Sequence, residues 1–310
     1  MGCAVCRPGH DLPYAKPSRA PPDPSLFPNY LQNEKGLWLR STEWWPRTEV
    51  QATVFIVSGL GEHANRYDSI ARRLNEEGFA CFSVDNQGAG GSEGLRLYVE
   101  RFSHFVDNIL LYVRHIHERY PELRETPQIL LGHSMGGLIS FLVALREPKL
   151  FKATVLSGPA FAAVDSPSPG SCKRKMLDFL SRTIPKLEIA KLNAELVSYN
   201  KPVVELVRQD PYYTNVKLRA RFLAEFLEAQ EFALAEVKRL KTPFPLLIVF
   251  GEDDKLCNLE RAREIFRLFP SETKEMRTYP YAGHEVLTEV DREAILNDVV
   301  TFIKKHYRES

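Results

Sequence analysis

One serine of the chain lies in a pattern that could make it a nucleophile. The motif Gly132-x-Ser134-x-Gly136 follows the apolar run 128–131 and precedes a second apolar stretch, 137–145. This order is typical of a tight strand-to-helix turn that strains the serine backbone and pushes its hydroxyl outward. Glycines on either side let the neighbouring backbones approach. The motif therefore predicts a serine prepared for covalent catalysis.

A serine hydroxyl becomes strongly nucleophilic at neutral pH only when an imidazole takes its proton and a carboxylate orients that imidazole. In sheets with this turn, the three residues follow in the order Ser, Asp or Glu, His, each on a loop after a strand. Only His284 and His306 follow Ser134, and His306 falls inside a predicted terminal helix. We therefore predict His284 as the general base.

Three carboxylates compete for the role of the acid. Glu252, Asp253 and Asp254 directly follow the apolar strand 245–251. A residue immediately after a strand usually still completes the turn. This favours Asp254 and leaves Asp253 as the alternative.

Ester cleavage also needs two backbone N–H groups for the negative charge that develops on the carbonyl oxygen. One should come from Met135, the residue after the nucleophile, at the start of a helix whose dipole favours negative charge. The other should come from the glycine loop after the strand 50–57. Leu60 is the expected donor because Gly59 and Gly61 free the backbone around it.

The elements that must position these residues alternate along the chain. A β-hairpin is predicted at 36–45, further strands at 50–57, 80–84, 128–131, 151–156, 245–251 and 274–279, and helices at 66–78, 102–120, 137–145, 259–268 and 291–307. Alternation of this kind requires a mostly parallel sheet with helices on both faces. Residues 159–241 contain no convincing strand and are rich in helix formers. They indicate a helical cap inserted after the sixth strand, so the predicted class is α/β.

The predicted domains are a tail at 1–28, a first core segment at 29–158, the cap at 159–241 and a second core segment at 242–310. The tail holds seven of the 21 prolines, which favours disorder. Gly2 suits N-myristoylation and Cys3 suits S-palmitoylation, although that pattern prefers Ser or Thr at the position of Cys6. The alternative is a solvated arm. Cys3, Cys6 and His10 lack the fourth ligand of a structural zinc site.

Charge and composition exclude several classes of function. Lysine plus arginine number 41 against 40 acidic residues. This balance, and the absence of a basic stripe with interleaved aromatic residues, argue against nucleic-acid binding. Cysteines 81, 172 and 257 are scattered, which does not fit a disulfide framework and favours a reducing compartment. No apolar run approaches the roughly 20 residues of a spanning helix, and no signal peptide is recognised. We expect a cytoplasmic protein, peripheral on membranes. Its oligomeric state is not indicated.

The motifs together resemble those of the monoglyceride lipases and related lysophospholipase-like serine hydrolases. The matching segments begin at about residue 36 and are Gly59-Leu60-Gly61-Glu62-His63 with Arg66-Tyr67, Asp85-x-x-Gly88-x-Gly90-x-Ser92-x-Gly94, Gly132-His133-Ser134-Met135-Gly136-Gly137, Asp210-Pro211 and Gly251-x-x-Asp254-x-Leu256-Cys257.

The resemblance implies an α/β-hydrolase fold with a cap, and hydrolysis of esters that carry one long acyl chain. It implies Ser134, Asp254 and His284 as the triad and Leu60 and Met135 as oxyanion donors. It also implies that Glu62 and Arg66 lie near the polar head of the substrate. The expected reaction is hydrolysis of monoacylglycerols through an acyl-serine, without metal or cofactor. The alternatives are a lysophospholipase, a medium-chain carboxylesterase, or an inactive membrane-anchored scaffold.

One stretch of the cap could contact a membrane. In residues 173–187, Met176, Leu180, Ile184 and Leu187 fall along one side of a helix, and basic residues gather at one end. A helix of this type can lie in a membrane interface with its apolar side down. The alternative is an ordinary helix packed on the sheet. Phe222, Leu223, Phe226, Leu227 and Leu234 could line an acyl tunnel, although core packing explains them equally well.

Overall fold

The computed structural model describes residues 29–166, 169–191, 205, 208–210, 212–213, 217–289 and 291–307. The predictions made for the tail 1–28, including acylation at Gly2 and Cys3, lie outside these residues.

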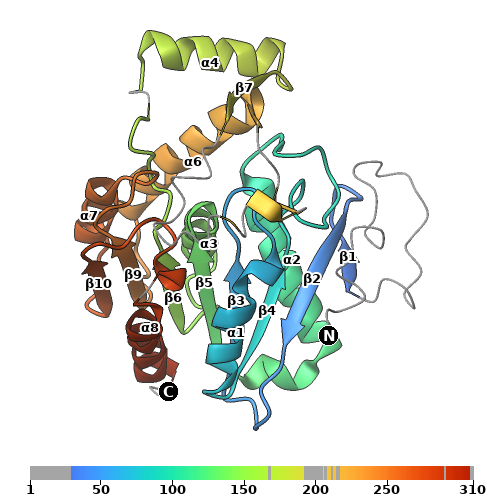
Figure 1. The fold of residues 1–310 in the computed structure, drawn as a ribbon, viewed down its shortest axis with the longest axis vertical. Coiled ribbons are helices and arrows are strands. Elements are labelled where there is room, and N and C mark those ends of the chain that lie inside the picture. The colour runs from blue at the N-terminus through green and yellow to red at the C-terminus, as the bar shows by residue number, and fades with distance from the viewer. Residues whose placement is uncertain are drawn as a thin grey trace.

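A mixed sheet forms the centre of the molecule (Figure 1). In the described residues it has eight strands in the order β1-β2-β4-β3-β5-β6-β9-β10. The strands are β1 (Tyr30–Gln32), β2 (Trp38–Trp44), β3 (Ala52–Val57), β4 (Phe79–Val84), β5 (Gln128–His133), β6 (Ala153–Ser157), β9 (Leu246–Gly251) and β10 (Lys274–Tyr279). β2 pairs antiparallel with both β1 and β4, and every other neighbouring pair of this sheet is parallel. The predicted mostly parallel α/β sheet is confirmed.

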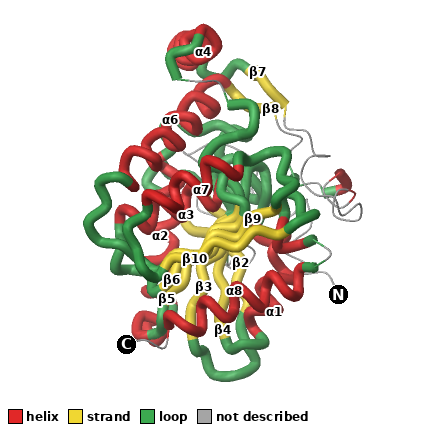
Figure 2. The backbone as a smooth tube through the Cα atoms, turned by 90° about the vertical axis from the view of Figure 1, so that its left-hand side faces the viewer, coloured by secondary structure: helices red, strands yellow, loops and turns green. Residues whose placement is uncertain are grey.

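Helices cover both faces of this sheet (Figure 2). On one face lie α2 (Ser103–Arg119), α3 (Met135–Arg146) and α7 (Leu259–Leu268), and on the other lie α1 (Asp68–Asn75) and α8 (Arg292–Tyr307). The central strands are buried on both sides, so successive side chains of β3 enter different cores. Phe55 and Val57 pack with α2 and α3, whereas Val54 and Ile56 pack with α1 and α8. This explains why the central strands are continuous apolar runs.

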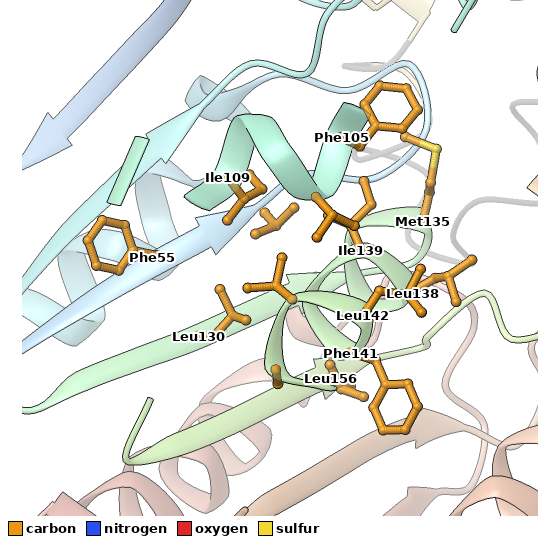
Figure 3. Packing of buried hydrophobic residues seen from close by; sticks show 14 of the residues in the cluster. Phe55, Phe105, Ile109, Leu130, Met135, Leu138, Ile139, Phe141, Leu142 and Leu156 are labelled. Atoms are coloured by element: carbon orange, nitrogen blue, oxygen red, sulfur yellow. The ribbon is translucent and has the colours of Figure 1, made fainter. Parts of the chain in front are cut away.

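The nucleophile motif rests on the first of these cores. Met135, Leu138, Ile139 and Leu142 of α3 pack against α2 and the sheet (Figure 3). Leu138 and Ile139 are fully buried. A close-packed interior of this kind resists small displacements. The packed core therefore fixes the position of the turn before α3.

Between β6 and β9 the chain forms the elements that lie above the sheet in Figure 2: α4 (Cys172–Thr183), β7 (Glu188–Lys191), β8 (Lys217–Arg219) and α6 (Ala220–Val237). Leu177 of α4 packs on Ala224 and Leu227 of α6. The expectation of no strand in this region was wrong, because β7 and β8 form a small antiparallel pair. Both are short and rich in charged residues, so they show no apolar alternation that would predict a strand.

The first hairpin also differs from the prediction. β2 is continuous across the region 38–44, and its hairpin partner is β1, which precedes it. The turn is made at Asn33, whose side-chain oxygen accepts hydrogen bonds from the backbone N–H of Lys35 and Leu37, and at Gly36, with φ of 73°. Asparagine and glycine are common at such turns, so this signal was present in the sequence. Among the described helices, none combines the length and apolar character needed to span a bilayer.

Candidate active site

Ser134 lies at the turn between β5 and α3. Its backbone has φ of 54° and ψ of −120°, a combination that costs energy for a residue with a side chain. The turn is held by a hydrogen bond from the Ser134 N–H to the Ser157 carbonyl, at 2.9 Å. A Cβ added at Gly136 would lie 2.1 Å from the Val57 carbonyl oxygen, and one added at Gly132 would lie 2.3 Å from the Gly136 oxygen. Glycine is therefore required at both positions by the packing of the turn.

His284 and Asp254 come together from two loops at the same edge of the sheet. The His284 Nδ1 lies 2.7 Å from Asp254 Oδ2, and the imidazole is buried. The other oxygen of Asp254 accepts hydrogen bonds from the backbone N–H of Leu256 and Cys257, at 2.8 and 2.9 Å. These bonds fix the carboxylate in the orientation that holds the ring. The carboxylate that meets His284 thus belongs to Asp254 rather than to Asp253.

The surroundings of His284 favour its protonated form. Burial alone would lower the pKa of the imidazole, but the Cys257 sulfur and the Asp254 carboxylate outweigh it and raise the pKa above the usual value of 6.5. His133, whose ring centroid lies 4.9 Å from that of His284, behaves differently. Burial lowers the pKa of His133 to about 4, so this ring is neutral at pH 7. Of the two adjacent imidazoles, His284 is the one suited to accept a proton.

A pH profile of the reaction should show this raised pKa. Only neutral His284 can accept the serine proton, so we expect kcat/KM to fall as the pH is lowered through a pKa above 6.5. The profile can be measured with a soluble ester. Because burial also raises the pKa of Glu285 to about 7, the same limb should persist in Glu285→Gln. An acid limb at or below pH 6.5 would contradict the geometry described here.

Two backbone N–H groups near Ser134 are available to an oxyanion. In the described part of the chain, neither the Leu60 N–H nor the Met135 N–H donates a hydrogen bond to a protein acceptor. Met135 begins α3, where first-turn N–H groups have no partner within the helix. A Cβ placed on Gly59, beside Leu60, would lie 3.3 Å from the Ser134 Cβ. The glycine loop therefore lies directly against the serine.

Glu62 and Arg66 contact each other and further protein groups beside the site. Glu62 accepts hydrogen bonds from the Gly59 N–H at 2.7 Å and the Tyr67 hydroxyl at 2.6 Å. Arg66 donates through Nε to Glu62 at 3.3 Å and through a terminal nitrogen to Glu285 at 2.5 Å. Glu62 lines the cavity that contains Ser134, whereas Arg66 lines a smaller neighbouring one. Contact of either residue with substrate stays a prediction.

Ser134 and His284 line a cavity of about 430 Å³ whose wall includes residues of α6. The other polar side chains that line it are Glu62, His133, Asp165, Ser166, Tyr213, Gln230 and Lys255. The remaining wall is largely apolar and includes Leu60, Leu218, Leu223, Phe226, Leu227 and Leu256. Of the residues predicted to line an acyl tunnel, Leu223, Phe226 and Leu227 line this cavity. Phe222 and Leu234 belong to the core instead.

Two sets of contacts at the site were not predicted, although their residues lie in the segments that match the family. Cys257 is buried in the cavity wall near His284 and Asp254, and burial raises the pKa of its thiol. It stands three residues after Asp254, a spacing that could have indicated its place. His63 of the glycine loop contacts Asp210 of the segment between β6 and β9, with 2.7 Å between Nε2 and Oδ2. Because 147 positions separate these two residues, no local pattern could have predicted this contact.

A mostly parallel sheet with helices on both faces, a strained serine between strand and helix, and an aspartate and a histidine on later loops define the α/β-hydrolase class. Residues 48–291 match the family described as serine aminopeptidase S33, a hydrolase family. The chain belongs to this family.

Three similar proteins indicate which kind of hydrolase the chain resembles. The chain is 31% identical to the monoglyceride lipase of Rattus norvegicus over 276 residues, covering 88% of this chain and 89% of the relative. It is 32% identical to the monoacylglycerol lipase of Mycolicibacterium smegmatis over 263 residues, covering 85% and 91%. The crystal structure of the monoacylglycerol lipase of Paleococcus ferrophilus matches with a TM-score of 0.74 and 25% identity, covering 86% of this chain and 99% of that one. The predicted resemblance is confirmed.

Proposed function

We propose that the protein hydrolyses monoacylglycerols to a fatty acid and glycerol through an acyl-serine intermediate. The observation that carries this proposal is the cavity, which is lined by both Ser134 and His284 and has a largely apolar wall that includes residues of α6. A pocket of this shape suits an ester with one acyl chain and a small polar head. Relatives at 31% and 32% identity bear the names of lipases for this substrate class.

The reaction follows from the placement of the side chains. The His284 imidazole takes the proton of the Ser134 hydroxyl as the oxygen attacks the ester carbonyl, and Asp254 stabilises the imidazolium. The N–H groups of Leu60 and Met135 receive the charge on the former carbonyl oxygen. The imidazolium then protonates the departing glycerol oxygen. A water molecule, deprotonated by the same ring, releases the fatty acid and restores the serine.

The alternatives differ in the head group that the cavity accepts. A lysophospholipase would need cations near the phosphate; the Arg66 guanidinium is engaged by Glu62 and Glu285, whereas Lys255 lines the cavity. An aminopeptidase would need a carboxylate for the substrate amine; Glu62 is bound to Gly59, Tyr67 and Arg66, whereas Asp165 lines the cavity. The largely apolar wall suits an acyl chain better than a phosphate or a peptide, which favours the monoacylglycerol.

A hydrolysis panel tests the proposal. It should compare a monoacylglycerol, a lysophospholipid of the same chain length, a short aryl ester and an aminoacyl arylamide. We expect the highest kcat/KM on the monoacylglycerol. Equal or faster turnover of the lysophospholipid would contradict the assignment to monoacylglycerols and favour a lysophospholipase. The absence of turnover on every substrate would favour the inactive scaffold.

We further propose that residues 159–241 form a cap that contacts membranes peripherally. Met176, Phe179 and Ile184 are 59%, 61% and 53% exposed, and the basic residues Lys173, Lys175, Arg182 and Lys186 are exposed nearby. An exposed apolar face beside basic residues suits an interface with anionic lipid. Of the residues predicted for this face, Leu180 instead packs partly against the neighbouring helix. Acylation of Gly2 and Cys3 would add a second anchor, which the mass of the N-terminal peptide tests.

The double variant Met176→Ser/Phe179→Ser should weaken binding to anionic vesicles. Each side chain that enters the membrane contributes about 1.5 kcal/mol, so binding should fall about tenfold per residue. Co-sedimentation with vesicles measures this effect. Phe232→Ser is the matched control, because Phe232 is 55% exposed but lies beside α2 and α3. Equal binding by the double variant and the wild type would rule out this face.

A further inference from the structure

A chain of buried polar contacts joins the two loops that flank Ser134. It begins at the Gly59 N–H, which donates to Glu62 at 2.7 Å, and continues from Glu62 to Arg66 at 3.3 Å. From Arg66 it reaches Glu285 at 2.5 Å. Gly59 precedes the proposed oxyanion donor Leu60, and Glu285 follows the proposed base His284. The two ends of the chain are therefore next to the two groups that must be placed around the serine.

The members of this chain are desolvated and closely held. The side chains of Arg66, Glu62 and Glu285 are 12%, 7% and 5% exposed. Although burial opposes ionisation of Glu62, a positive charge on His133, which that ring carries only at low pH, the charge of Arg66 and the hydrogen bonds from Tyr67 and Gly59 lower the pKa of Glu62 to about 2. Charge-assisted hydrogen bonds are among the strongest in proteins, particularly away from water. The contact of Arg66 with Glu62 therefore resists displacement of the glycine loop, and its contact with Glu285 resists displacement of the His284 loop most strongly above pH 7, where burial still allows that carboxyl to ionise.

The position of Arg66 argues against a direct part in substrate binding. It lines the small cavity formed with Glu62, Tyr67 and Glu285 and not the one that contains Ser134. Its guanidinium carbon lies 5.6 Å from the centroid of Tyr213, a ring that does line the larger cavity. The guanidinium thus makes its polar contacts with two carboxylates that belong to the protein.

We propose that Arg66 is a positioning residue, which sets the separation between the Leu60 oxyanion donor and the His284 base by binding Glu62 and Glu285 at the same time. This inference rests on the proposed function, because it assigns the two loops their parts in ester hydrolysis. It predicts that Arg66 acts equally on every ester, whatever its head group. A residue that binds the glycerol head would instead act only on substrates that have one.

The test compares Arg66→Gln with the wild type on a monoacylglycerol and on a p-nitrophenyl ester of the same acyl chain. Displacement of a reacting group by about 1 Å can cost on the order of 10² in rate. We expect kcat to fall by on the order of 10² on both substrates, with little change in KM. The rate at which an alkyl fluorophosphonate labels Ser134 should fall in parallel, because that reaction has neither a glycerol head nor a deacylation step.

Two further variants keep the test informative if Arg66→Gln does not fold. Arg66→Lys retains the charge but offers a single nitrogen in place of a planar fork, so it cannot hold both carboxylates in the same geometry. We expect a normal melting temperature and a kcat between those of the wild type and Arg66→Gln on both esters. Arg72→Gln is the matched control, since Arg72 pairs with Asp68 on the exposed side of α1 and its side chain is 73% exposed.

Three outcomes would overturn the inference. The first is a loss confined to the monoacylglycerol, and the second is a loss that appears in KM rather than kcat, because both indicate head-group binding. The third is wild-type kcat in folded Arg66→Lys and Arg66→Gln. The parallel measurement on Ser134→Ala separates this inference from the proposed function. If Ser134→Ala is inactive while Arg66→Gln is fully active, only the role of Arg66 is wrong.

Discussion

Replacing Ser134 by alanine should lower kcat/KM for a monoacylglycerol by on the order of 10⁶, since loss of the nucleophile removes the covalent route altogether. The substitution leaves the turn intact, because alanine at φ of 54° carries a strain similar to that of serine. Release of fatty acid, measured over hours with the purified variant and compared with the wild type, gives the ratio of the two kcat/KM values. A loss of only a few fold would mean that another residue is the nucleophile.

Ser134→Gly extends the same prediction to stability. This variant also lacks the hydroxyl, so it should be as inactive as the alanine variant. Because glycine adopts positive φ without a steric penalty, its free energy of unfolding should exceed that of the alanine variant by about 1 kcal/mol. Denaturant unfolding measures the difference. A glycine variant less stable than the alanine variant would show that the backbone at Ser134 is not strained by its side chain.

Asp254→Asn should lower kcat by on the order of 10⁴. An asparagine can still accept the backbone N–H groups of Leu256 and Cys257 through its oxygen, as Asp254 Oδ1 does now. That orientation turns its NH₂ group toward His284 Nδ1, which must then act as acceptor. The ring would carry its proton on the nitrogen that should receive the serine proton. The loop should therefore fold normally while the base is held in the wrong tautomer.

Asp253→Asn is the matched control for this variant. Asp253 is the adjacent residue with the same side chain, and its backbone N–H donates to the Ala282 carbonyl at 3.1 Å, a bond that the substitution preserves. We expect its kcat to stay close to that of the wild type, with both variants checked for equal melting temperatures. The reverse order of losses would move the acid to Asp253.

The parts of the site that follow local rules could be predicted from the sequence. The turn at Ser134 has its own glycine spacing, and the boundaries predicted for α7 and β10 agree with those observed. The order of serine, acid and histidine along the chain limited the candidates to a few residues. The turn and these boundaries agree with the structure because the strand-to-helix turn and the ends of parallel strands constrain short segments.

The contacts around Arg66 could not be predicted in this way. Arg66 and Glu285 lie 219 positions apart, and their contact depends on how two loops converge at the sheet edge. The family resemblance placed Glu62 and Arg66 near the substrate but could not indicate that each is engaged by other protein groups. The small strands β7 and β8 were missed for a related reason. Their pairing depends on the fold of the cap and not on an apolar pattern.

The most direct test of the account is to find which residue carries the covalent bond. The protein should be treated with a fluorophosphonate that bears one long alkyl chain, and its intact mass and peptides should then be measured beside the remaining monoacylglycerol hydrolysis. We predict a single adduct on the peptide that contains Ser134, with activity falling in proportion to its occupancy, and no adduct in Ser134→Ala. An adduct on another residue, or full activity after Ser134 is occupied, would contradict the account.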